Sequence, residues 1–216
     1  MRFLSRSILA LAAVATVSAN TPATAEIGIG ADLVSRYIWR GTDFGNAVSV
    51  QPGIAYATDA FEIGAWSSWA INGGGANEND LYATVYLGPV GLTITDYFFP
   101  AAAPANFFSY SDGDAVHILE ASVAADVGPV SLMAAFNFSG DEEDSFYLEG
   151  MLPLAALSTD DVEVGLGLSL GNGVYTTDTD PALVTISLNV SAGDYFAQYI
   201  LNPDAEITFL VFGTSF

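Results

Sequence analysis

The chain contains no cysteine and no lysine, and each absence limits what the protein can be. Without cysteine the chain forms no disulfide and no Cys/His metal cluster. Only four residues are basic, all of them arginine, whereas 25 are acidic, and the formal net charge is −21. Because such a surface repels phosphate backbones, we expect no nucleic-acid partner.

Long hydrophobic runs are also absent after residue 25, although 51% of the chain is hydrophobic. A transmembrane helix needs roughly 20 consecutive apolar residues, which no segment of this part supplies. Strong hydrophobicity without long runs indicates apolar residues dispersed at every second position, which is the pattern of β-strands with one apolar face.

The first 25 residues have the pattern of a secretion signal. Arg2 and Arg6 precede an apolar stretch over residues 8–19, and Ala23-Thr24-Ala25 fits the small-x-small cleavage pattern. An N-terminal membrane anchor is the alternative, but the apolar stretch is short and ends in polar residues. We therefore predict a signal peptide over 1–25, cleavage before Glu26, and one domain over 26–216.

The rest of the chain reads as about twelve strands, with 10 and 14 as alternatives. Residues 130–139 show the alternation clearly, because apolar and mostly polar or small side chains take turns along them. The expected strands are roughly 27–40, 48–58, 61–71, 80–88, 91–99, 115–127, 130–139, 145–154, 162–171, 183–191, 195–201 and 206–216.

The connections between these strands alternate in length and charge. Tight turns such as 88–91 and 128–129 take turns with longer segments such as 72–79, 100–114 and 172–182, which are rich in Gly, Asn and acidic residues. Short turns at one rim and long loops at the other are typical of a transmembrane β-barrel, with turns in the periplasm and loops outside the cell. We therefore predict an all-β, closed antiparallel barrel in the cell outer membrane, in contact with its lipid. A soluble β-sandwich is the alternative.

Aromatic residues near the strand ends are expected to form two girdles at the membrane interfaces. These are Tyr37, Trp39, Tyr56, Phe61, Trp69, Phe98, Phe99, Phe146, Tyr175, Tyr195 and Phe216. The last strand ends in Phe216, which resembles the C-terminal signal read by the barrel-assembly machinery. That machinery is the one protein partner we expect.

The inward faces of the expected strands supply candidates for a lumen or constriction. They are Asp32, Arg36, Arg40, Glu62, Glu120 and Glu149. One hypothesis is a charged constriction around Arg36 that filters solutes. The other, which we favour, is a structural ion pair between Arg36 and Glu120 or Glu149, because buried charges are usually paired.

The run Asp141, Glu142, Glu143 and Asp144 offers oxygen ligands of the kind that Ca²⁺ and Mg²⁺ prefer. It lacks the spacing of an EF-hand loop, so we interpret it as a solvated acidic loop and predict no metal site and no cofactor.

His117 is the single histidine, with Ser109, Ser111, Asp112 and Asp114 close in sequence. A hydrolase at the rim is one hypothesis for these residues. One histidine among many serines and aspartates is weak support, and we predict no enzyme activity.

Residues 31–41 (Ala-Asp-Leu-Val-Ser-Arg-Tyr-Ile-Trp-Arg-Gly) resemble the Ser-x-Tyr-x-x-Arg-Gly opening of the TorF family of bacterial outer-membrane proteins. The similarity continues through 50–56, 61–68 and 79–82 and is looser after residue 100. Tyr37, Arg40 and Gly41 match the signature, whereas Arg36 departs from it. The resemblance implies an outer-membrane barrel, proposed to be a porin, without a known substrate.

These patterns together lead us to expect a channel for small solutes whose acidic outer rim favours cations. The alternative is a plugged barrel with a structural or adhesive role that binds divalent cations.

Overall fold

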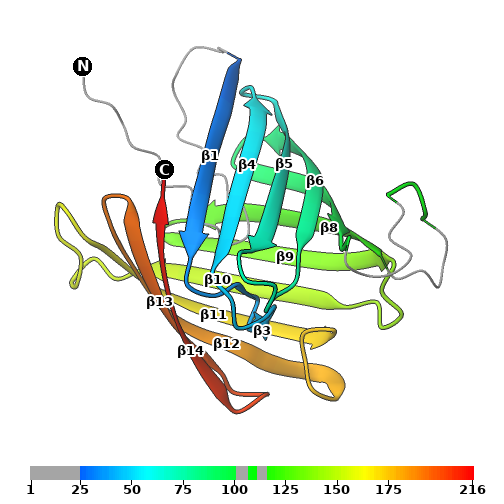
Figure 1. Ribbon diagram of the computed structural model, residues 1–216. Helices are drawn as coiled ribbons and strands as arrows, with labels where there is room; N and C mark the ends of the chain where they lie inside the picture. Colours follow the sequence, from blue (N-terminus) through cyan, green and yellow to red (C-terminus); the bar gives the residue numbers. More distant parts are fainter. Residues whose placement is uncertain (1–24, 101–106, 111–115) are drawn as a thin grey trace.

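The computed structural model describes residues 25–100, 107–110 and 116–216, and in this part the chain forms a closed antiparallel barrel of twelve strands (Figure 1). The predicted all-β barrel fold is therefore confirmed. The predicted signal peptide lies outside the described residues except for Ala25. No helix in the described part has the length and apolarity needed to cross a membrane.

The barrel strands follow one another around the wall in chain order. They are β1 (Glu26–Val34), β4 (Ser49–Ala57), β5 (Phe61–Ala70), β6 (Glu78–Leu87), β7 (Val90–Phe98), β8 (His117–Val127), β9 (Val130–Ser139), β10 (Phe146–Pro153), β11 (Glu163–Gly173), β12 (Thr179–Ala192), β13 (Tyr195–Asn202) and β14 (Ile207–Ser215). A separate two-stranded sheet consists of β2 (Ile38–Trp39) and β3 (Thr42–Asp43).

The first and last barrel strands pair with each other, as predicted. In β1, residues 32–34 lie opposite residues 213–215 of β14. The backbone N–H of Phe216 donates to the carbonyl of Ala31 over 3.0 Å, and the reverse bond measures 2.9 Å. This closure removes the free sheet edge that an open structure would leave.

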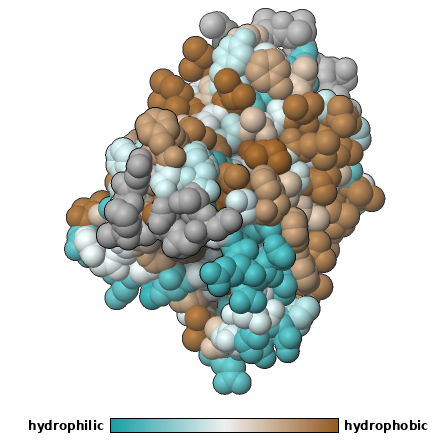
Figure 2. All heavy atoms as spheres, turned by 90° about the vertical axis from the view of Figure 1, so that its right-hand side faces the viewer, coloured by the Kyte–Doolittle hydropathy of each residue, from teal (hydrophilic) through white to brown (hydrophobic). Residues whose placement is uncertain are grey.

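Alternation along each strand gives the barrel an apolar outer wall. In β9, Leu132, Phe136 and Phe138 are between 44% and 46% exposed, whereas Met133 and Asn137 on the opposite face are buried. Figure 2 shows hydrophobic residues gathered along one flank and hydrophilic residues gathered at the lower end of the same view. The outward face of the barrel is therefore apolar, and the inward face carries the more polar side chains, as in transmembrane barrels.

The predicted first strand, 27–40, is too long, because β1 ends at Val34. The Ser35 hydroxyl accepts a hydrogen bond from the Phe212 amide, and the chain then turns away from the wall. Tyr37 and Trp39, both assigned to the aromatic girdles, therefore lie inside the barrel. Tyr175, in the connection between β11 and β12, is also inside it, and Phe98 is buried at 8% exposure. Among the outward aromatics, Tyr195 and Phe216 are exposed.

The connections fall into two rims. The short-turn rim holds residues 58–60, 88–89, 128–129, 154–162 and 193–194, and the long-loop rim holds 35–48, 71–77, 99–116, 140–145, 174–178 and 203–206. The predicted alternation of connection lengths is therefore confirmed apart from 154–162, which is longer than four of the six connections at the other rim. In Figure 1, β1 and β4–β6 run steeply and β8–β12 lie nearly level, so the two walls cross.

The inside of the barrel is filled unevenly. The packed side, formed by the inward side chains of β9–β14 together with Val34 of β1 and Tyr175 between β11 and β12, carries two apolar clusters. Their buried members are Val34, Phe196, Ile200, Phe209 and Val211 in one cluster and Met133, Ala135, Tyr147, Tyr175 and Val184 in the other. The open side, formed by the inward side chains of β1 and β4–β8, lines most of a cavity of about 290 Å³.

Candidate functional site

Residues 35–48, here called the inward segment, lie between β1 and β4 and fold into the barrel. The short strands β2 and β3 pair Ile38 with Asp43 and Trp39 with Thr42, which leaves Arg40 and Gly41 as the two-residue turn. Both turn residues have positive φ, 50° at Arg40 and 80° at Gly41. This is the backbone of a type I′ hairpin turn, in which glycine is favoured and a large side chain is strained. The hairpin thus holds an arginine at its tip.

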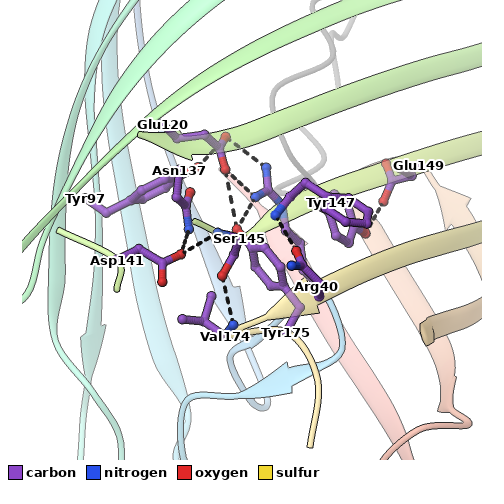
Figure 3. A network of polar contacts seen from close by, with 12 residues as sticks. Arg40, Tyr97, Glu120, Asn137, Asp141, Ser145, Tyr147, Glu149, Val174 and Tyr175 are labelled. Atoms are coloured by element: carbon purple, nitrogen blue, oxygen red, sulfur yellow. Dashed lines mark hydrogen bonds and ion pairs between the residues drawn. The ribbon is translucent and has the colours of Figure 1, made fainter. Parts of the chain in front are cut away.

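Arg40 makes a buried ion pair with Glu120 of β8 (Figure 3). Its Nη2 donates to Glu120 Oε1 over 3.0 Å, and its Nη1 donates to the Tyr175 hydroxyl over 2.7 Å. The guanidinium carbon lies 4.4 Å from the ring centroids of both Trp39 and Tyr147. Arg40 and Glu120 are 8% and 2% exposed, so the charge pair is almost fully shielded from solvent. The paired, hydrogen-bonded geometry is what makes such burial tolerable.

Tyr37 connects the other end of the inward hairpin to β6. Its hydroxyl donates to Glu78 Oε2 over 2.8 Å, and Glu78 is fully buried. Its ring stacks on Phe44 at 4.8 Å and lies 5.7 Å from the ring of Trp66. The carboxyl of Asp80, two residues along the same face of β6, makes a side-chain hydrogen bond with the carboxyl of Glu78.

Gly41 lets the hairpin approach the opposite wall. A Cβ at this position would lie 2.6 Å from the carbonyl oxygen of Val184 in β12. The Asn202 side chain of β13 donates to the carbonyl of Gly41 over 3.1 Å. The inward segment therefore contacts β6 and β8 on one wall and β12 and β13 on the other, and it crosses the lumen near the long-loop rim.

The cavity lies between this segment and the short-turn rim. Trp39 and Arg40 border its inner end, and Gly28, Ala55 and Phe216 border it further along the barrel. Its wall combines aromatic rings, small residues and a few charged groups, which is the composition of a site for a small ligand or solute.

The structure brings three predicted acidic residues of the lumen into distinct surroundings. Asp32 is buried and lines the cavity. Glu62 accepts hydrogen bonds from the hydroxyls of Tyr82 at 2.7 Å and Tyr86 at 3.2 Å. Glu149 accepts from the Tyr147 hydroxyl at 2.8 Å, on the packed side (Figure 3).

The predicted ion pair of Arg36 with Glu120 or Glu149 is wrong. Arg36 pairs with Asp43 instead, and Arg40 takes Glu120. Because β1 ends at Val34, Arg36 and Arg40 do not continue the inward face of that strand. The hydrogen bond from Arg36 lowers the pKa of Asp43 below its usual value, and both side chains remain partly exposed.

The acidic loop is organised by its own chain. Asp141 accepts hydrogen bonds from the Asn137 side chain at 2.8 Å and from the amides of Glu143 and Ser145 at 3.0 and 3.1 Å. Burial raises the pKa of Asp141, but the hydrogen bonds from Ser145 and Asn137 outweigh it, so the net shift is downward. The other three acids, Glu142, Glu143 and Asp144, are exposed. Across the described ranges, no three His, Cys, Asp or Glu side chains are grouped to hold a metal ion.

His117 lies on β8 beside Asp96 of β7. Its Nδ1 is 2.7 Å from Asp96 Oδ1, and its ring stacks between Phe98 at 4.7 Å and Tyr110 at 4.2 Å. The Tyr110 hydroxyl donates to the other Asp96 oxygen over 2.7 Å. Of the residues proposed as its catalytic neighbours, Ser111, Asp112 and Asp114 lie outside the described residues.

Sequence reasoning missed Glu78, Asp80 and Tyr175 as inward groups and placed Tyr37 at the membrane interface. A usable signal was present at residues 40–41, since a residue followed by glycine between two short alternating runs is a hairpin pattern. Tyr37, Arg40 and Gly41, the three residues that match the motif quoted above for residues 31–41, fasten the inward segment to the barrel.

One family description matches most of the chain. It reads "Bacterial protein of unknown function (Gcw_chp)" and covers residues 16–192. Neither the curated proteins nor the solved structures include a match to this sequence.

Proposed function

Because the chain belongs to this bacterial family of unknown function, we propose its function from its geometry. The protein is an outer-membrane barrel that passes small solutes, and the inward segment forms the narrowest part of its lumen. The resemblance of residues 31–41 to the TorF family, a family of proposed porins, supports this reading.

The apolar outer wall supports a place in the membrane. Large side chains that face outward are found on every barrel strand from β1 to β14, including Ile29, Leu81, Leu132, Leu168 and Leu210. In hydrocarbon every backbone group must find a partner within the protein, and the closed sheet meets that demand. A barrel of this kind keeps its fold in mild detergent, so heated and unheated samples should migrate differently on a denaturing gel.

The inner wall carries the proposal of a conduit. Polar side chains line it, as in the hydroxyl contact of Thr84 with Thr93 at 2.8 Å and the bond from Asn189 to Ser187 at 3.0 Å. A cavity of about 290 Å³ extends along this wall as far as Arg40 and Glu120. A barrel interior with polar walls and free space is suited to hydrated solutes.

The long-loop rim supports a preference for cations. It holds many carboxylates, whereas Arg36 and Arg40 are the only basic residues within the described part, and both are paired with acids. The excess negative potential concentrates cations at the mouth. Described acids at this rim include Asp43, Asp141, Glu142, Glu143, Asp144, Asp178, Asp204 and Glu206.

Planar-bilayer recording with the refolded protein tests the conduit. We expect small conductance steps and, under a salt gradient, a reversal potential that favours cations. Replacing both Arg40 and Glu120 with alanine should raise the conductance, because it removes the contact that holds the hairpin across the lumen. A protein that inserts but gives no steps, in either form, contradicts the proposal.

A plugged, structural barrel is the second candidate, and the anchoring of the inward segment favours it. The segment is held on both walls by buried contacts, including Tyr37 to Glu78 and Arg40 to Glu120. This candidate predicts no flux of small sugars or amino acids into liposomes that contain the native protein. In its adhesive form it also predicts a calcium-dependent rise in melting temperature.

We also propose that the barrel-assembly machinery recognises β14 through Phe216. This residue is 75% exposed, and its backbone closes the barrel against β1. Removal of Phe216 should lower the amount of folded protein in the outer membrane while leaving refolding in detergent largely intact. Equal membrane levels for both forms contradict this role.

A further inference from the structure

The cavity on the open side is bordered by two adjacent cross-strand rows. In the first row, Gly30, Gly53, Trp66, Asp80 and Tyr97 are successive partners on β1, β4, β5, β6 and β7. In the next row the partners are Gly28, Ala55, Gly64, Tyr82, Thr95 and Glu120. Each row passes from small residues to large ones. The free space therefore lies against β1 and β4 and faces an aromatic wall.

The aromatic wall is closed at its inner end by the inward segment. Tyr37 lies 5.7 Å from Trp66, and Trp39 lies 5.1 Å from Tyr97, between ring centroids. Together with Tyr82 these residues give five rings around one space. The face of an aromatic ring carries negative potential and attracts cations, most strongly where water is excluded.

The charges around the cavity also favour a positively charged ligand. Asp32, Asp80 and Glu120 line it together with Arg40, which is already paired with Glu120. Asp80 is only 6% exposed, and its carboxyl makes a side-chain hydrogen bond with the carboxyl of Glu78, which is fully buried. Two neighbouring buried carboxyls are costly to ionise without a counter-charge, and a cation in the cavity would supply it.

We infer that this cavity binds a small organic cation, of the quaternary or alkylammonium class, with the charged nitrogen among the rings and close to Asp80. A weakly hydrated organic cation suits ring faces, whereas a metal ion would need several oxygen ligands, and no such group occurs among the described side chains. The inference goes beyond the proposed conduit, because a binding site is present whether or not the ligand passes through.

Binding can be measured without any flux. Two of the three tryptophans, Trp39 and Trp66, line the cavity, so the fluorescence of the refolded protein reports its occupation. Choline chloride is the probe, sodium chloride at equal ionic strength is the salt control, and the third titrant is the uncharged analogue in which carbon replaces the ammonium nitrogen. We expect saturable binding of choline, about tenfold weaker binding of the analogue, and no saturable response to sodium. Equal binding of the analogue, or an equal response to sodium, overturns the inference.

Two variants locate the site. Asp80→Asn keeps the shape and removes the carboxylate, and we expect binding about tenfold weaker. Gly28→Leu fills the space, since a Cβ at Gly28 meets no atom within 4 Å, and we expect it to abolish binding. Glu163→Gln, at an exposed position outside the cavity, is the matched loss of one charge and should bind like the native protein.

Heat-dependent migration on a gel shows whether each variant folds, and only folded samples are compared. Native-like affinity in both Asp80→Asn and Gly28→Leu overturns the inference. Choline binding without conductance contradicts only the conduit, whereas conductance without choline binding contradicts only this site.

Discussion

The packed and open sides of the lumen are built from the same alternating strands, yet one is filled and the other is hollow. On the packed side the inward positions of β13 and β14 carry Phe196, Ile200 and Phe209, all at most 8% exposed. On the open side several inward positions of β1 and β4 carry glycine or alanine, as at Gly28, Gly53 and Ala55. The same pleated barrel can therefore enclose a packed core on one side and a cavity on the other. The volumes of the inward side chains, at every second position, determine which of the two forms.

The inward segment lies on the border between the two sides and depends on both. Arg40 of this segment pairs with Glu120, which also borders the cavity. Gly41 packs against Val184 of the packed side. Changes to the buried anchors of the segment, Tyr37 and Arg40, should therefore be costly, and changes to the packed side should have intermediate effects. Changes to the open side, or to the partly exposed Arg36, should have small effects.

The largest effect is expected for Arg40→Ala. It leaves the Glu120 carboxylate, 2% exposed, without its cation, and we expect the free energy of unfolding to fall by about 3–5 kcal/mol. Urea titration of the refolded protein, followed by tryptophan fluorescence, measures the change. The double variant Arg40→Met with Glu120→Met should be less destabilised, because no buried charge is left over. A loss below about 1 kcal/mol in the single variant contradicts the role given to this pair.

Tyr37→Phe tests the other anchor of the segment. It removes the hydroxyl that donates to Glu78 over 2.8 Å, and we expect a loss of about 1.5–3 kcal/mol because Glu78 is fully buried. Tyr56→Phe is the control, since Tyr56 is 38% exposed on the outer wall, and its cost should stay within about 0.5 kcal/mol. Equal effects of the two substitutions would show that the segment is not held at Tyr37.

A matched pair of glycine substitutions compares the two sides directly. At Gly213, on the packed side, an added Cβ would lie 2.3 Å from the ring of Phe196, and we expect Gly213→Ala to cost about 1–3 kcal/mol. At Gly53, on the open side, the nearest atoms would lie 3.8 Å away, so Gly53→Ala should change stability by no more than about 0.5 kcal/mol. Urea midpoints of the two variants give the comparison, and a reversed order would refute it.

A small effect is also expected at the partly exposed pair of Arg36 and Asp43. The lowered pKa of Asp43 means that the pair stabilises the native state above about pH 5 and that this contribution disappears as the pH falls through the folded-state pKa. Arg36→Gln should therefore cost about 0.2–1 kcal/mol at neutral pH and nothing at strongly acidic pH. Melting temperatures of the two proteins, compared across this range, should converge on acidification. A constant difference would assign the effect of Arg36 to its packing over Phe209.

Much of the barrel follows from local pattern. The alternation over 130–139 predicts a strand whose faces differ, and β9 spans Val130–Ser139. The same reasoning failed at residues 35–40, which continue the pattern of the first strand but leave the wall. The chain leaves the wall after Ser35 and reverses at Arg40 and Gly41, whose φ angles are positive. Alternation alone does not detect such a turn, although Gly41 marks it in the sequence.

The candidate site was harder to predict than the wall around it. Asp32 and Glu120 were expected in the lumen from strand parity and are buried there. Glu78 and Asp80 were missed because they lie at the start of β6, directly after a loop. At such a boundary the sequence does not show where the inward–outward alternation of side chains begins. The empty space beside them is not encoded in any single stretch, since it arises from small residues on β1 and β4 and large ones on β5–β7.

The sequence by itself determined the closed, two-faced sheet, because period-two alternation and turn chemistry act between near neighbours along the chain. Only the tertiary structure decided which arginine meets Glu120, 80 residues away, and which side of the lumen stays open. Those outcomes depend on strand register and on side-chain volumes summed across the whole barrel, quantities that exist only once the sheet has closed.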